Sequence, residues 1–108
     1  MRYTNWDIGG KIVKEDERYV VRDNTELQNL ILSSTYLRAN KSTTGHKHKG
    51  QEEVYVFVKG GGKMELDDKT IKVRTGTTVI IKDGVFHRVH AGDKGAYFIC
   101  VFDGKRYT

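Results

Sequence analysis

Two histidines separated by one residue, His46 and His48, restrict the fold of this chain more than any other feature of its sequence. In an extended backbone, side chains two positions apart leave the same face of the strand, so both imidazoles would point the same way. Glu53 opens the β-prone run that follows, and His87 comes much later, after a glycine turn. If these four side chains converge, the fold must bring strands that are distant in sequence to a common point.

Three imidazoles and one carboxylate suit a single divalent transition metal, namely Fe, Mn, Ni, Co or Zn. Unlike a closed structural zinc site, such a set can hold an octahedral ion with two positions open to water or substrate. A lone histidine in a strand is more often a hydrogen-bonded structural residue than a ligand. The spacing of the pair, the nearby carboxylate and the distant imidazole together favour a metal site made by His46, His48, Glu53 and His87.

The rest of the chain consists of short β-prone runs separated by turn residues, with little that favours a helix. We predict strands at residues 11–14, 18–22, 30–38, 53–58, 63–66, 70–74, 78–81, 86–91 and 96–102. Turns are expected at residues 15–17, at the glycines 60–62, and at 67–68 and 82–84. Many short strands at this spacing are typical of an all-β sandwich or barrel.

Alternation within two of these strands assigns side chains to faces. Glu53, Tyr55 and Phe57 share one face of their strand and three valines occupy the other, so this strand should be central. In the later strand, His87 and His90 fall on opposite faces. His90 is therefore a poor ligand candidate in spite of its proximity.

Length and composition predict one domain, residues 1–108, with a modest core. The first residues contain no apolar signal-peptide core and no later run is long enough to span a bilayer, so we expect a cytoplasmic protein. Cys100, the single cysteine, fits a reducing compartment. Its apolar neighbours indicate a buried small hydrophobe rather than a nucleophile.

The formal net charge of +5 would suit an anionic partner. The lysines are scattered through the chain instead of forming a run, which argues against nucleic acid. An anionic small molecule, such as a phosphorylated or acidic sugar, would account for the charge, and so would solubility alone.

Residues 40–91 resemble the two conserved boxes of the cupin superfamily. In the first box, G-x5-H-x-H-x3,4-E-x6-G, the matching residues are His46, His48, Glu53 and Gly60, and Asn40 stands at the leading glycine. In the second box, G-x5-P-x-G-x2-H-x3-N, they are Gly76, Gly84 and His87, while Lys82 and Ala91 replace the proline and the asparagine. The boxes occupy residues 40–60 and 76–91, about half of the chain.

This resemblance implies a double-stranded β-helix, or jelly-roll barrel, with a metal ion held by the matched histidines and glutamate. It also implies a homodimer formed through an edge of the sheet. A fainter similarity to the cupin domain associated with mannose-6-phosphate isomerases rests on Trp6 and on residues 87–93.

Two functions remain open. The preferred one is a metal-dependent enzyme acting on a carbohydrate or similar small hydroxylated or carboxylated molecule, as an isomerase before a lyase or dioxygenase. Tyr55 and Arg38 are then the candidate catalytic residues. The alternative is a non-catalytic module that binds a sugar or another small molecule. Tyr36, Phe57 and Phe98 either join Tyr55 and Arg38 in lining the pocket or are ordinary core and surface residues.

Overall fold

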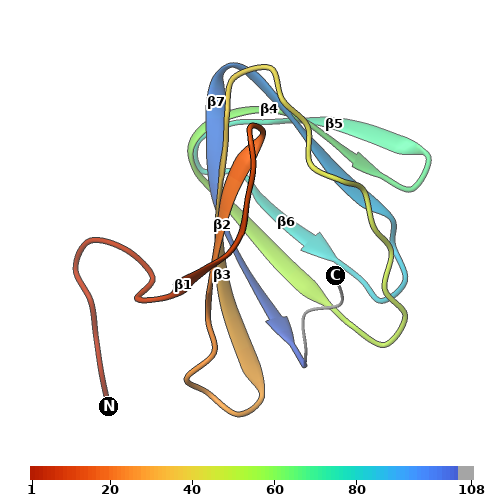
Figure 1. The fold of residues 1–108 in the computed structure, drawn as a ribbon. Helices are drawn as coiled ribbons and strands as arrows, with labels where there is room; N and C mark the ends of the chain where they lie inside the picture. Colours follow the sequence, from red (N-terminus) through yellow and green to blue (C-terminus); the bar gives the residue numbers. More distant parts are fainter. Residues whose placement is uncertain (105–108) are drawn as a thin grey trace.

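The computed structural model describes residues 1–104, which contain seven β-strands and no helix (Figure 1). The strands are β1 (Lys11–Glu15), β2 (Tyr19–Asn24), β3 (Leu30–Leu37), β4 (Glu53–Leu66), β5 (Lys69–Val73), β6 (Thr78–Ile81) and β7 (His87–Asp103). The all-β fold class is thus confirmed. No helix in the described part of the chain could cross a membrane.

The sheet is organised around two long neighbouring strands, β4 and β7. Its strand order is β1-β2-β3-β7-β4-β5, with β6 paired to β4, and every pairing is antiparallel. Along its length β4 pairs first with β6 and then with β5, while the C-terminal part of β7 also pairs with β3. Because the two long strands change neighbours along their course, the sheet curls into a jelly roll, as predicted (Figure 1).

The glycines at 60–62 do not form the predicted turn. Strand β4 continues through them, with register shifts against β7 on both sides of Gly60. At Gly62 φ is 154°, and a Cβ there would lie 2.0 Å from the carbonyl oxygen of His90. Only glycine permits this close approach, so these residues bend the strand without ending it.

The strands predicted at 86–91 and 96–102 are likewise a single strand, β7. Its partner β4 is equally continuous, and the pairs Gly62–Ala91 and Gly60–Ala96 bracket the stretch between the two predicted strands. Between these pairs β7 advances five residues while β4 advances two, so residues 92–95 form a bulge within one continuous strand, which the local sequence does not distinguish from a strand end.

The core lies on the inner faces of the curled sheet. Phe57, Leu37 and Met64 are completely buried and Val89 nearly so. Burying one such side chain stabilises the fold by roughly 1.5–3 kcal/mol. The predicted alternation of β4 is confirmed, because its inner residues are buried whereas Val56 and Val58 are exposed.

Asn40 begins the segment that leads from β3 to β4. Its φ of 62° is left-handed, the conformation for which the first cupin box uses glycine and which asparagine adopts more readily than most residues. Its amide donates to the carbonyl oxygen of Gly92 at 2.9 Å, which attaches the start of the segment to β7.

Candidate metal centre

Donor atoms of His46, Glu53 and His87 lie within 4.8 Å of one another. Glu53 is the first residue of β4 and His87 the first of β7, and both are buried. His46 lies in the connection between β3 and β4 and exchanges two backbone hydrogen bonds with His87, at 3.1 and 3.0 Å. The curled sheet therefore brings three of the four expected ligands to one point.

The imidazole of His87 is oriented as a metal ligand requires. Its Nδ1 donates to the carbonyl oxygen of Val85 at 3.0 Å, and because a carbonyl only accepts, this nitrogen carries the proton. In the neutral ring Nε2 then has a lone pair for a ligand. Nε2 is buried without a hydrogen-bond partner, and the nearest carboxylate oxygen, Glu53 Oε2, lies 3.6 Å away.

A buried nitrogen without a partner costs stability unless something occupies the position that it faces. A metal ion would satisfy it, and the carbonyl on Nδ1 is the supporting contact typical of metal-bound histidines. Together with the carboxylate of Glu53 and the second imidazole of His46, this geometry fits a divalent ion. The three donors also match the borderline and hard ligands that first-row transition metals accept.

His48 is near this group but is not one of its members. Its ring centroid lies 4.9 Å from that of His46, with the planes inclined at 33°. Both rings are half-buried whereas Lys47 between them is exposed, in agreement with the predicted alternation. His48 as a fourth ligand stays a prediction.

The pKa values of the two central imidazoles shift in opposite directions. The pKa of His46 falls from 6.5 to about 4, first because the ring is buried and then because of the charge on His87. Burial also lowers the pKa of His87, but the Glu53 carboxylate and the Val85 carbonyl together outweigh it and raise that pKa. His46 is therefore neutral at pH 7, the form in which an imidazole can bind a metal.

The donors open into two adjoining hollows. The inner one, of about 50 Å³, is lined by Lys14, Tyr19, Val21, Thr35, Thr43, Thr44, His46, Tyr55, His87 and Phe98. The outer one, of about 510 Å³, is lined by Lys14, Glu15, Asp16, Arg18, Tyr19, Thr44 and His46. Four residues line both. His46 is one of them and His87 lines the inner hollow, so these two donors lie at the inner end of a pocket of the size typical of small-molecule sites.

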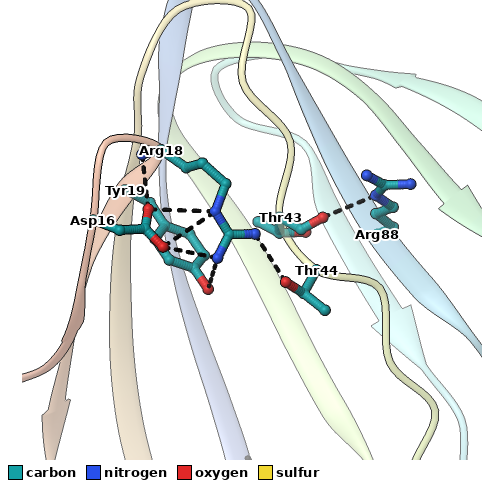
Figure 2. A network of polar contacts seen from close by, with 6 residues as sticks. All are labelled: Asp16, Arg18, Tyr19, Thr43, Thr44 and Arg88. Carbon is teal, nitrogen blue, oxygen red and sulfur yellow. Dashed lines mark hydrogen bonds and ion pairs between the residues drawn. The ribbon is translucent and has the colours of Figure 1, made fainter.

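Arg18, in the turn between β1 and β2, contacts three other residues that line this pocket (Figure 2). Its guanidinium pairs with the Asp16 carboxylate at 2.8 Å and lies 4.4 Å from the centroid of the Tyr19 ring. It also donates to Tyr19 Oη at 3.1 Å and to Thr44 Oγ1 at 2.8 Å. These contacts connect the β1–β2 turn to the segment that carries His46.

The same segment is attached to β7 from the other side. Arg88 Nε donates to the carbonyl oxygen of Thr43 at 2.8 Å (Figure 2). Thr43 and Val89 are joined by two further bonds, in which each backbone amide donates to an oxygen of the other residue at 2.9 and 3.0 Å. Although residues 43–46 lie largely outside regular strand, these bonds hold their backbone and thus the position from which the His46 side chain extends.

The other candidate residues fall into two groups. Tyr55 and Phe98 line the inner hollow and stack with centroids 5.2 Å apart, and the Tyr55 ring lies 5.7 Å from that of His87. Phe57 is completely buried in the core. Tyr36 and Arg38 are exposed and line neither hollow, because they lie on the outer side of β3 and just beyond its end.

His90 lies apart from the metal ligands. Its Nδ1 is 2.6 Å from Ser42 Oγ and its Nε2 is 2.5 Å from Glu65 Oε2, so both ring nitrogens have partners on the other face of the strand. It is not a member of the group of donors found among the described residues.

Sequence patterns missed Lys14, Tyr19, Thr35 and Thr44 as pocket residues. The two threonines and the tyrosine carry no motif of their own. In the sequence, Lys14 resembles any charged residue of an edge strand. Its inward orientation depends on a register shift in β1 that no local pattern indicates.

Comparison with known proteins agrees with this geometry. The profile of the cupin domain family matches residues 35–102. An uncharacterized protein of Methanocaldococcus jannaschii is 27% identical over 94 residues, which cover 73% of this chain and 75% of that protein.

Solved structures share the fold at low identity. KdgF from Halomonas sp. superposes with a TM-score of 0.79 at 14% identity, over 89% of this chain and 87% of that one. Oxalate decarboxylase from Bacillus subtilis, a protein with Mn(II) centres, superposes with a TM-score of 0.79 at 21% identity over 88% of this chain. The match spans 28% of the decarboxylase chain. The similarity to the cupin domain of mannose-6-phosphate isomerases stays a prediction.

Proposed function

This chain belongs to the cupin family, and on that premise we propose that it is a metal-dependent enzyme acting on a carbohydrate or similar small hydroxylated or carboxylated molecule. Isomerisation is preferred to lyase or dioxygenase chemistry. The observation that carries the proposal is the convergence of His46, Glu53 and His87 beside an inner hollow that adjoins a pocket of about 510 Å³.

The ligands of the divalent ion would be His46, Glu53 and His87, with His48 as the fourth. When bound, such an ion polarises a carbonyl or hydroxyl oxygen of the substrate. In the neutral ring, the contact between His87 Nδ1 and the Val85 carbonyl places the proton on Nδ1 and leaves the lone pair on Nε2 for the ion. Tyr55 and Phe98 place aromatic surface beside the donors, where electrostatic interactions are stronger than in bulk water.

Tyr55 is the residue to which we assign proton transfer. It is buried, lines the inner hollow and lies beside His87. Its phenolic hydroxyl can hold a proton at neutral pH and donate it to a substrate oxygen that develops charge. Arg38 is exposed and takes no part in this proposal.

The alternative is a binding module without turnover. It fits the same geometry, because an inner hollow of about 50 Å³ admits the ion and the coordinating end of a ligand whether or not that ligand reacts. In that case the ion would hold the molecule in place and Tyr55 would only shape the site.

Turnover is tested with protein loaded separately with Fe(II), Mn(II), Ni(II), Co(II) or Zn(II). Each form is incubated with pools of sugar phosphates, uronates and catechols, and products are followed by mass spectrometry. We expect product from one pool with at least one metal, loss of product in His87→Ala, and retention in the matched control His90→Ala. Ligand binding by calorimetry without product for any metal would favour the binding module.

The homodimer also stays a proposal. It is supported by apolar side chains that β4, β6 and β7 expose to solvent, namely Val56, Val58, Ile80 and Val101. Sedimentation equilibrium should give twice the monomer mass. A single monomeric species at high protein concentration would contradict it.

A further inference from the structure

Strand β1 turns Lys14 toward the interior and leaves its two aliphatic residues exposed. Ile12 and Val13 are 48% and 46% exposed, whereas Lys14 is half-buried. Hydrophobicity alone favours the opposite arrangement, because burying an ammonium group costs free energy that burying isoleucine or valine would not. A feature of the backbone must therefore turn Lys14 inward, and we expect a charged group in that position to serve the site.

The cause is a β-bulge. Ile12 pairs with Arg22 and Lys14 with Val21, so β1 advances two residues while β2 advances one. Directly paired residues share a face of the sheet, and Val21 is buried in the interior. The bulge thus places Lys14 on the inner face, whereas regular alternation would place it outside with Ile12. Re-aiming a side chain next to a functional site is a recurrent use of bulges.

Lys14 lies where the two hollows meet. It lines both of them, together with His46, Tyr19 and Thr44. Among the described lining residues it is the one lysine or arginine common to both. Arg18 lines only the outer hollow, and its guanidinium is held by Asp16, Tyr19 and Thr44.

From this placement we propose that Lys14 is the specificity-determining residue and that it binds the carboxylate of the substrate. A hydroxyl or carbonyl oxygen of the same substrate then faces the metal ligands. This deepens the proposed function and rests on it. A single ammonium group balances the one charge of a carboxylate, whereas a phosphate usually recruits several donors or an arginine fork. The substrate class is therefore a small hydroxy or oxo acid, with its body in the outer hollow.

The test uses Mn(II)-loaded protein and three matched pairs of probes: glycolate and ethylene glycol, glycerate and glycerol, and gluconate and sorbitol. Metal content is measured by elemental analysis, and binding by calorimetry and by the relaxation of water protons near Mn(II). The variants are Lys14→Met, Lys14→Arg and, as a control on the same strand, Lys11→Met, which changes an exposed lysine.

We expect the wild-type protein and Lys11→Met to prefer an acid to its uncharged partner. In Lys14→Met that acid should bind about 10- to 100-fold more weakly, as for the loss of a hydrogen bond to a charged group, at unchanged Mn(II) content. Lys14→Arg should recover part of the affinity because it keeps the charge.

Two results would overturn the inference while leaving the metal site intact. One is a wild-type protein that holds Mn(II) but shows no preference for any acid, and the other is Lys14→Met with wild-type affinity for the preferred acid. Failure of the wild-type protein to bind Mn(II) or any of the other four metals would instead overturn the proposed function, and this inference with it.

Discussion

His46 and His87 are joined at the backbone, each amide donating to the carbonyl of the other, and their imidazoles meet edge to face with centroids 4.3 Å apart. This pairing attaches the connection before β4 directly to the first residue of β7. The backbone hydrogen bonds therefore fix the separation of the two Cα atoms, and only the side-chain rotamers remain to set the distance between the ring nitrogens. Such pre-organisation lowers the cost of assembling a metal site.

Replacing any of the three converging donors should reduce metal content. His46→Ala, Glu53→Ala and His87→Ala each remove one donor, and we expect a loss of affinity of at least the roughly 10- to 100-fold seen when supporting contacts of metal ligands are lost. Elemental analysis and competition with a chelator measure this. His90→Ala is the control, because both of its ring nitrogens bind partners on the other face. Loss of the metal in His90→Ala alone would contradict the assigned ligands.

Acid should weaken one contact of the β1–β2 turn in a defined pH window. Hydrogen bonds from Arg18 hold the pKa of Asp16 below its ordinary value of 3.8. Because the pKa is depressed in the folded state, the resulting stability is fully present above pH 3.8 and is lost as the pH falls through the folded-state value. Carboxyl chemical shifts followed by NMR should show Asp16 titrating below 3.8 in the wild-type protein. In Arg18→Met, the midpoint should return toward 3.8.

A midpoint for Asp16 that is the same in both proteins would show that Arg18 does not interact with this carboxylate in solution. Because both side chains remain partly exposed to solvent, the effect on overall stability should be small.

Glycine at position 62 should be required for the bend in β4. In Gly62→Ala the new methyl group would meet the carbonyl oxygen of His90, in addition to the cost of a φ of 154°. Gly76→Ala is the matched control, because φ there is 94° but nothing lies within 4 Å of the added Cβ. We expect Gly62→Ala to lose about 1–3 kcal/mol more than the control in urea unfolding, since overpacking adds to backbone strain. Equal losses would mean that β4 can relax around the methyl group.

The sequence was sufficient for features that local patterns encode. The alternation of β4 gave the inward positions of Glu53 and Tyr55, and the parity of β7 placed His87 and His90 on opposite faces. The cupin boxes marked the residues that converge. These features depend on the two-residue period of a strand and on residue types with few alternative roles.

Features that depend on the register between paired strands were not accessible. Glycines in β4 have the same local signature whether the chain turns or bends, and the neighbouring strand decides between the two. The bulge that turns Lys14 inward likewise arises from the register of β1 against β2. His48 illustrates the same limit, because the spacing predicts a shared face but does not decide which ring reaches the common point.

Arg18 should act on the metal site through position alone. It donates to Thr44, two residues before His46, and lies over Tyr19 in the pocket wall. In Arg18→Met we expect the affinity for Mn(II) to fall by about tenfold, as for the loss of a contact that orients a ligand, with a small change in urea midpoint because the residue is near the surface. Arg18→Lys should restore little of the Mn(II) affinity. An ammonium group cannot bond Asp16 and Thr44 at the same time through separate nitrogens, as the guanidinium does. The control is Arg22→Met, which removes an arginine from β2 that lines neither hollow. If Arg18→Met bound Mn(II) as tightly as the wild-type protein, the backbone bonds between His46 and His87 would be enough to position the ligand without the arginine.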